Sequence, residues 1–431
     1  MKLFGSMHEE NNELYIGGIS SKELAKKYGT PLYVIDEKLV RQNCKEYYEN
    51  FKVKEKKNRV AYAGKAFLPI AMCQIIKEEG LSLDVVSGGE LYTAYKAGFN
   101  MENVLFHGNN KTMDEMEMGV RLNVGRFVAD NFYEIEKVNE IAKKMSKVQK
   151  VFLRITPGIE AHTHEYIKTG QIDSKFGFTL SNGDALRAVK EVLNFQNVEL
   201  AGLHCHIGSQ IFDIAPYLEE TRVMLAFIKE IQEETNYEIK ELDLGGGFGI
   251  YYTEVDKPRG AEEFCSEILK EAEESSKKLG IKLPKLIIEP GRSIIGNAGS
   301  TLYTVGSIKE IQHMRKYVSV DGGMTDNIRP SLYNAEYECE IANKFNASKE
   351  KVTISGKCCE SGDILINDVN ISEVESGDIL IVSTTGAYGY SMANNYNKIP
   401  KAAVVLVSDG KERLICKRET YEHMLSNEIM I

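Results

Sequence analysis

The feature of this sequence that most constrains its fold is a regular alternation of short apolar runs and amphipathic segments between about residues 60 and 292. Within 261–279, for example, Phe264, Ile268 and Ala272 recur at helical spacing among Glu and Lys. Strands that alternate with helices predict βαβ units and a parallel sheet. The eight expected strands are Val60–Ala63, Ser82–Val86, Val104–His107, Phe127–Ala129, Val151–Thr156, Leu200–His206, Leu242–Leu244 and Leu286–Glu289.

Eight such units in about 240 residues fit the size and strand count of a (β/α)8 TIM barrel. An open, doubly wound sheet is the alternative, although it usually needs fewer strands before its topological switch. After about residue 300 the helical segments stop, and the sequence predicts an antiparallel β domain, either a barrel or a sandwich. Its expected strands are Thr301–Ile308, Tyr317–Val320, Glu338–Ala342, Val352–Ile354, Ile379–Ser383 and Ala403–Val407.

The predicted domains are a barrel over residues 36–300 and a C-terminal β domain over 301–431 that also includes residues 1–35. The run Leu14–Ile19 predicts one short strand with no local partner, so we expect it to pair with the C-terminal β domain. Asp409 and Gly410 follow the last expected strand and favour a tight hairpin turn.

Charge and hydropathy restrict the partners. The chain has 53 Lys and Arg against 63 Asp and Glu, and this net charge of -10 argues against a nucleic-acid partner. The apolar run Ala402–Val407 is far shorter than the ~20 residues that span a bilayer, and the first residues lack the apolar core of a signal peptide. Eight cysteines without a CxxC pair argue against a disulfide framework. We therefore expect a cytoplasmic protein without a membrane partner.

Unusual residues follow the expected barrel strands, at the positions where parallel barrels carry their chemistry. Lys65 follows the first strand, Gly245–Gly249 the seventh and Glu289–Arg292 the eighth. Barrels often bind phosphate in the loops after strands seven and eight, and glycines let the backbone approach an anion closely. Arg292 would add a charge-assisted hydrogen bond. A tight turn remains the alternative for the glycines, because Ile250 breaks the GxGxxG pattern.

A phosphate site beside a reactive lysine points to one cofactor. An apolar neighbourhood would favour the neutral amine of Lys65, which can capture a carbonyl, although a solvated surface lysine is the alternative. Pyridoxal 5′-phosphate (PLP) has both a phosphate and an aldehyde, and its pyridine nitrogen needs an acidic partner, for which Glu289 is the candidate. His206 could stack on the ring. His204 and His206 share one side of a strand, but no third ligand has suitable spacing, so we predict no metal site.

Nine short motifs, spread in order over nearly the whole chain, indicate a family. They are Tyr62–Ala66, Asp84–Leu91, Lys175–Gly177, His204–Gln210, Gly245–Gly249, Glu289–Arg292, Arg329–Tyr333, Cys359–Asp363 and Gly386–Gly389. In this order they resemble the fold type III, alanine-racemase-like PLP-dependent decarboxylases, and most closely the diaminopimelate decarboxylase family. Many members carry His where this chain has Tyr337.

The resemblance implies a role for each matching residue. Lys65 would bind the cofactor aldehyde covalently, Glu289 would pair with the pyridine nitrogen, and His206 would cover the ring. Cys359 would donate a proton, so that the implied catalytic residues are Lys65, Cys359 and His206. The residues implied around the cofactor also include Ser209, Gly246, Gly247, Gly291, Arg292 and Tyr388, and those implied to bind substrate are Arg292, Arg329, Tyr333, Glu360 and Tyr388.

The resemblance also implies an activity and an assembly. Members decarboxylate meso-2,6-diaminopimelate to L-lysine and CO2, the last step of lysine biosynthesis by the diaminopimelate route. They are homodimers with shared active sites, in which the segment that contains Cys359 and Glu360 comes from the other subunit. The substrate has an amino acid group at each end. Paired hydrogen bonds from arginines suit the distal carboxylate, and Glu360 suits the distal ammonium.

Three alternatives have distinct sequence signatures. A related decarboxylase acting on ornithine, arginine or carboxynorspermidine would have no use for Arg329, because those tails are cationic. A non-catalytic regulatory protein of the same fold would be expected to lose Lys65 or Cys359, and this chain has both. A racemase would need a second acid–base residue, usually Tyr, opposite the lysine.

Overall fold

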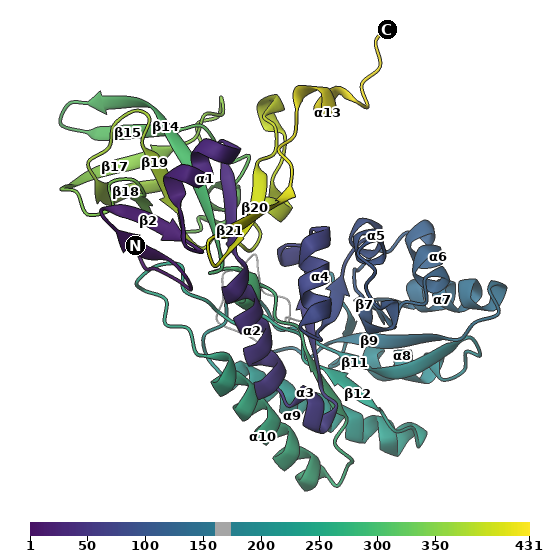
Figure 1. The fold of residues 1–431 in the computed structure, drawn as a ribbon. Coiled ribbons are helices and arrows are strands. Elements are labelled where there is room, and N and C mark those ends of the chain that lie inside the picture. The colour runs from purple at the N-terminus through teal and green to yellow at the C-terminus, as the bar shows by residue number, and fades with distance from the viewer. Residues whose placement is uncertain (160–173) are drawn as a thin grey trace. The chain divides into compact units, whose positions relative to one another are not determined.

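The computed structural model describes residues 1–159 and 174–431. These residues divide into two compact units (Figure 1). The β unit comprises Met1–Asn43, Ile250–Lys257 and Ile294–Ile431, and the barrel unit comprises Cys44–Gly249 and Pro258–Ser293. Within the described ranges, none of the helices combines the length and apolar character that crossing a membrane requires.

The barrel unit contains a closed sheet of eight parallel strands. Each strand pairs in parallel with its neighbours, and the pairing of β8 with β9 closes the ring. This closure confirms the predicted (β/α)8 barrel and excludes the open sheet. All eight expected strands are present, with ends shifted by at most two residues. They are β5 (Arg59–Ala63), β6 (Ser82–Val85), β7 (Val104–Phe106), β8 (Arg126–Ala129), β9 (Gln149–Thr156), β11 (Val198–His204), β12 (Glu241–Asp243) and β13 (Lys285–Ile288), and the short β10 (Phe178–Thr179) adds to β9.

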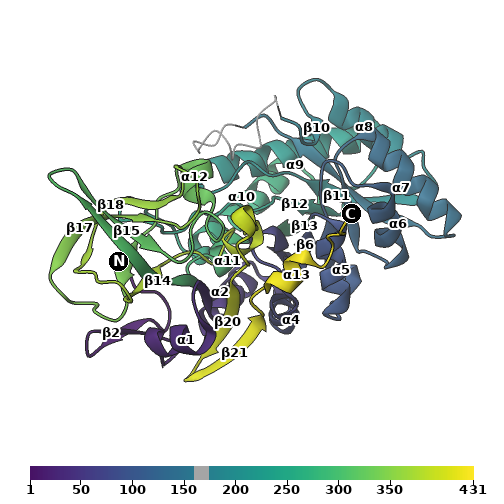
Figure 2. The ribbon, with the colours of Figure 1, turned by 90° about the horizontal axis from the view of Figure 1, so that it is seen from above.

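Helices surround these strands (Figure 2). The predicted helix over 261–279 is present with the same bounds and buries Phe264, Ile268 and Ala272. Local capping fixes where several helices begin, as in α6, where the Thr112 and Glu115 side chains form a capping box. The helices are α2 (Glu37–Asn50), in which the boundary between the units falls, α3 (Val53–Lys56), α4 (Ile70–Glu78), α5 (Gly88–Lys96), α6 (Met113–Arg121), α7 (Phe132–Lys144), α8 (Asp184–Val192), α9 (Ala215–Thr235), α10 (Ala261–Leu279) and α11 (Arg292–Ile295).

The β unit is built on a sheet with the order β18-β17-β15-β14-β4-β20-β21, and β19 pairs with both β14 and β16. The six expected strands are present, and Ser408 pairs with Lys411 across the predicted turn. Most of its strand pairs are antiparallel, as expected, and the exceptions are β15–β17 and β20–β4, which are parallel. The strands are β14 (Gly299–Ile311), β15 (Arg315–Val320), β16 (Cys339–Ile341), β17 (Lys349–Ser355), β18 (Ile364–Ser372), β19 (Ile379–Val382), β20 (Ala403–Ser408) and β21 (Lys411–Cys416).

Helical structure was expected to stop after about residue 300, but it continues beyond that point. Two short helices, α12 (Arg329–Tyr333) and α13 (Tyr421–Leu425), lie in the C-terminal part. Both are only five residues long, so they carry too little periodicity to be recognised.

The prediction for the N-terminal strand is only partly right. Leu14 lies in β2 (Glu13–Ile16), which has local partners in β1 (His8–Glu10) and β3 (Ile19–Ser20), contrary to expectation. The Leu14 N–H also donates to the Ala342 carbonyl at 2.8 Å, which agrees with the expected contact to the C-terminal part of the β unit. Gly17 and Gly18 have positive φ angles and turn the chain back on itself, so 14–19 is a hairpin and not one strand. The strand that joins the large sheet is β4 (Leu32–Asp36), which lies between β14 and β20 and is buried along its whole length.

Candidate active site

Lys65 lies in a single 3-10 turn, Gly64–Ala66, directly after β5. Its Nζ is 3.9 Å from Oδ2 of Asp84. Asp84 lies in the neighbouring strand β6, where it pairs with Ala63 at the end of β5. The side chain of Lys65 is 41% exposed, whereas that of Asp84 is 1% exposed. The apolar neighbourhood expected for Lys65 is therefore wrong, because the amine lies beside a buried carboxyl group and is open to solvent.

His206 lies just after β11, and its ring is held by the glycine loop, residues Gly245–Gly249. The Gly246 N–H donates to Nδ1 of His206 at 3.3 Å, so the proton of a neutral ring is on Nε2. Burial, together with the positive charge of Lys65, lowers the pKa of His206 well below its usual value. His206 is therefore a neutral aromatic ring at neutral pH.

Glu289 follows β13 and is contacted by two further histidines. Nε2 of His107 is 2.7 Å from Oε1, and Nε2 of His204 is 3.3 Å from Oε2. Burial alone would raise the pKa of Glu289, but the two imidazoles outweigh it and hold that pKa well below the usual range. Burial raises the pKa values of Asp84 and Asp243 instead. Of these three buried carboxyl groups, Glu289 is the one whose neighbours hold its pKa below the usual range.

The glycine loop packs closely against the loops next to it. A Cβ at Gly246 would collide with the carbonyl of Glu289, and one at Gly247, which has φ 101°, would collide with the carbonyl of Gly208. In the same region Arg292 donates to Oγ of Ser209 at 3.0 Å. The close approach that the sequence predicted for these glycines is thus present, beside a guanidinium and a hydroxyl group.

These residues fit the pyridoxal cofactor that the sequence predicted. A primary amine, a charged carboxylate and a neutral aromatic ring meet at the carboxyl end of the barrel, with Ser209 and Arg292 as partners for a phosphate. Buried polar atoms there also lack a hydrogen-bond partner among the described residues: both oxygens of Asp84, Nε2 of His107, Nδ1 of His204, Oδ2 of Asp243 and Oε1 of Glu289. Such atoms mark a site that is completed by a polar ligand.

In the β unit, Arg329 begins the short helix α12. Its Nε donates to the hydroxyl of Tyr337 at 2.9 Å. Its guanidinium carbon is 5.9 Å from the ring centroid of Tyr252 and 5.6 Å from those of Tyr333 and Tyr388. None of the described carboxylates forms an ion pair with Arg329. The four tyrosines thus hold a cation whose charge has no acidic partner in the described chain.

Tyr388 itself has an uncommon backbone. Its φ is 60°, a left-handed conformation that a bulky residue rarely adopts. Strained positions of this kind cluster at functional sites.

No role was expected for Tyr337 from the sequence, and the one sign of it was the departure from the family at that position.

The segment around Cys359 is held by its backbone. Oδ2 of Asp363 accepts from the Cys358 N–H at 2.7 Å, and Oδ1 of Asn397 accepts from the Cys359 N–H at 2.8 Å. Cys359 and Glu360 are exposed, whereas Cys358 is half-buried. Burial and the nearby Asp363 raise the pKa of Cys358 to about 11. Cys359 is the accessible thiol of the pair.

The predicted site residues fall into two groups. The barrel unit contains Lys65, His206, Ser209, Gly246, Gly247, Glu289, Gly291 and Arg292, and the β unit contains Arg329, Tyr333, Cys359, Glu360 and Tyr388. Asp84 and His107 also belong to the barrel group, although no role was expected for either. His107 ends an expected strand, and Asp84 lies within another, near its carboxyl end.

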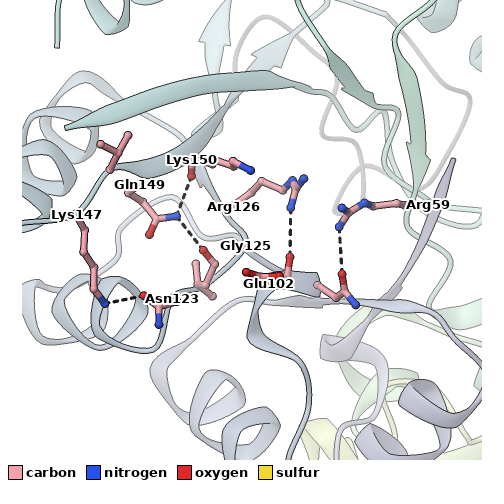
Figure 3. Close-up of a pocket in the computed structure, with 11 residues that line it drawn as sticks. Arg59, Glu102, Asn123, Gly125, Arg126, Lys147, Gln149 and Lys150 are labelled. Atoms are coloured by element: carbon pink, nitrogen blue, oxygen red, sulfur yellow. Dashed lines mark hydrogen bonds between the residues drawn. The ribbon is translucent and has the colours of Figure 1, made fainter. Parts of the chain in front are cut away.

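A cavity of about 350 Å³ at the opposite end of the barrel is a different feature (Figure 3). Arg59, Arg126 and Gln149, which begin β5, β8 and β9, are among its lining residues. Most of its charges already have partners. Arg126 forms two hydrogen bonds with Glu241 at 2.7 and 2.9 Å, and Lys147 donates to the Val120 carbonyl at 2.7 Å. The residues that line this cavity therefore hold together the amino ends of the strands, whereas the predicted active-site residues lie at the carboxyl ends.

The closed barrel, with an amine, a charged carboxylate and a glycine loop at one end, defines a PLP-binding barrel enzyme. Residues 37–296 match the family model described as "Pyridoxal-dependent decarboxylase, pyridoxal binding domain". The chain belongs to this family of pyridoxal-dependent decarboxylases, and its cofactor is pyridoxal 5′-phosphate.

Further matches cover nearly the full length of the chain. The chain is 51% identical to diaminopimelate decarboxylase of Bacillus subtilis over 425 residues, which are 98% of this chain and 97% of that one. A crystal structure of diaminopimelate decarboxylase from M. jannaschii is similar with a TM-score of 0.93 and 38% identity, and the match covers 99% of this chain and 98% of that one. A second structure of that enzyme, in complex with L-lysine, has the same TM-score.

Proposed function

We propose that this protein decarboxylates meso-2,6-diaminopimelate to L-lysine and CO2, as the last step of lysine biosynthesis. The observation that carries this proposal is the Arg329 guanidinium, held by four tyrosines without a carboxylate partner among the described residues. A distal carboxylate is the group it lacks, and diaminopimelate has one where ornithine and arginine do not. The names of the full-length relatives support the same substrate.

In this proposal the barrel residues bind and tune the cofactor. When bound, PLP supplies an aldehyde for the substrate amine and a ring that accepts the electron pair released with CO2. Lys65 would hold the aldehyde through its amine. Glu289 would accept a hydrogen bond from the protonated pyridine nitrogen, and His206 would pack against the ring. The residues proposed to bind the phosphate are Ser209, Gly246, Gly247, Gly291 and Arg292.

The residues of the β unit would bind substrate and complete the reaction. Arg329 binds the distal carboxylate, with Tyr333, Tyr388 and Arg292 as further contacts, and Tyr388 also approaches the cofactor. Glu360 binds the distal ammonium. Cys359 donates a proton to the carbon that loses CO2. Its exposed thiol supports this choice over Cys358, whose raised pKa reflects burial beside Asp363.

We further propose a cytoplasmic homodimer in which Cys359 and Glu360 act in the active site of the partner subunit. Their exposure in one chain supports a role at an interface. All eight cysteines are free, which agrees with a reducing compartment.

The direct test is CO2 release by the PLP-loaded enzyme from meso-diaminopimelate, ornithine and arginine under identical conditions. We expect kcat/KM for diaminopimelate to exceed the other two by at least about 100-fold, because a cationic tail leaves Arg329 unpaired. Preference for ornithine or arginine would contradict the proposed substrate. Loss of optical activity without CO2 release would indicate a racemase.

A further inference from the structure

His107 and His204 form a buried clamp around one carboxylate in the barrel unit. His107 follows β7, where its N–H donates to the Val85 carbonyl at 2.8 Å, and His204 is the last residue of β11. Their Nε2 atoms approach different oxygens of Glu289, at 2.7 and 3.3 Å, and their rings meet edge to face with centroids 4.8 Å apart. The sequence analysis considered His204 only as a partner for His206, which instead accepts the Gly246 N–H.

We propose that His107 and His204 are positioning residues that keep the Glu289 carboxylate charged and oriented toward the ring nitrogen of the pyridoxal cofactor. The inference deepens the proposed function and rests on its pairing of Glu289 with that nitrogen. No substrate contact is assigned to either histidine. Their contribution acts through Glu289 alone.

The two histidines act first on the charge of Glu289. Glu289 is only 6% exposed, and Asp84 and Asp243, two other acids, are at most 1% exposed close to it. A carboxylate in such a place loses its charge unless hydrogen-bond donors stabilise it. Burial lowers the pKa of His204 to about 3, so this ring stays neutral and donates through Nε2. The two imidazoles therefore favour the charged form of Glu289.

The two histidines also restrict the direction of the Glu289 carboxylate, which has about four lone-pair sites on its two oxygens. Nε2 of His204 makes a hydrogen bond to Oε2, and Nε2 of His107 lies 2.7 Å from Oε1 without hydrogen-bond geometry. The two rings therefore limit rotation of the carboxylate and leave sites for a further donor. The pyridinium N–H of the cofactor is such a donor. Without the histidines, Glu289 would take up a proton and would then offer the ring nitrogen a donor in place of an acceptor, which leaves the ring a poorer electron sink.

A bound metal ion is the rival explanation, because the ligand atoms of His107, His204 and Glu289 all lie within 4.8 Å of one another. Two histidines and one carboxylate are also a known zinc ligand set. The two explanations differ in what the purified protein contains. Stoichiometric metal that is lost in a His204 variant would overturn the positioning role.

The test is titration of the apoprotein with PLP and with its 1-deaza analogue, in which carbon replaces the ring nitrogen, followed by the absorbance of the bound cofactor. For His204→Leu we expect Kd for PLP to rise about 10- to 100-fold, because a hydrogen bond to a charged group is lost. Kd for the deaza analogue should change less than about twofold. His204→Gln, which retains a nitrogen donor, should recover most of the affinity, and His107→Leu repeats the test from the other ring.

Two controls separate this role from general damage to the core. Leu203→Ala alters the neighbouring, fully buried residue of β11, whose side chain points to the other face of the strand, and it should not discriminate between the two cofactors. In a Glu289→Gln background, His204→Leu should cause no further loss, because the carboxylate through which it acts is gone. Equal weakening of both cofactors, or of neither, would overturn the inference. Because cofactor affinity involves no substrate, failure of the diaminopimelate assay would leave this result intact.

Discussion

Arg329 offers the sharpest test of substrate choice, and Arg329→Met is the informative change. Methionine keeps a long flexible side chain among Tyr252, Tyr333 and Tyr388 but removes the charge and the donors. One hydrogen bond between charged groups contributes about 1.5–3 kcal/mol. We therefore expect kcat/KM for diaminopimelate to fall about 10- to 150-fold. The distal end does not change during decarboxylation, so the loss should lie mainly in KM and leave kcat nearly unchanged.

The assay is steady-state CO2 release with diaminopimelate and with lysine, which has the distal ammonium but no distal carboxylate. The slow reaction with lysine should be the same for Arg329→Met and the unchanged enzyme. Tyr337→Phe is the matched control, because it removes only the hydroxyl that accepts from Arg329 Nε at 2.9 Å, and we expect a smaller rise in KM of about 3- to 10-fold.

Two outcomes would refute this reasoning. The first is an unchanged KM for diaminopimelate in a variant whose melting temperature matches that of the unchanged enzyme. The second is an equal loss with lysine, which would mean that Arg329 supports the fold of the β unit and does not recognise a carboxylate.

Three further predictions concern the proton donor, the assembly and the barrel. Cys359→Ala should lower kcat at least about 100-fold with little change in melting temperature, since the thiol is exposed; a large loss of stability with normal turnover would show a packing role. Mixing inactive Lys65→Ala and Cys359→Ala homodimers should restore about one quarter of the activity after subunits exchange, and no recovery would contradict shared sites. Arg126→Met should cost about 3–5 kcal/mol in urea unfolding, because it leaves buried Glu241 without its two hydrogen bonds. Arg126 lowers the pKa of Glu241 although burial opposes it, so the stability that this pair provides is present above the unfolded pKa of about 4.3 and is lost as pH falls through the lower folded value. The difference between variant and unchanged protein should shrink in acid, and a difference that grows would refute the assignment.

Local patterns in the sequence predicted much of the fold. Strand and helix periodicity located all eight barrel strands, and the Asp409–Gly410 turn predicted the β20–β21 hairpin. Pairing between distant segments was not predictable in this way. Nothing near β15 or β17 indicates that they run parallel, and nothing near Leu32 indicates that β4 lies between β14 and β20. Leu14–Ile19 was misjudged because Gly17 and Gly18 were counted within a strand, where their positive φ angles make a turn.

In the active site too, some residues could be placed from the local sequence, whereas others could be recognised only in the closed barrel. A residue that follows a parallel strand must lie at the carboxyl end of the sheet, so Lys65, His206 and Glu289 could be placed there before any contact was known. Asp84, within β6, and His107, which follows β7, lie at the same end of the sheet. Asp84 was noted only as the first residue of a motif, and a single histidine carries no pattern of its own. Their place in the site becomes visible only when β5, β6, β7, β11 and β13 form one ring. In that ring, Nε2 of His107 and Nε2 of His204 both approach the carboxylate of Glu289. In a barrel of this kind, every titratable residue at or just beyond the carboxyl end of a strand is therefore a candidate for the site, whether or not a motif contains it.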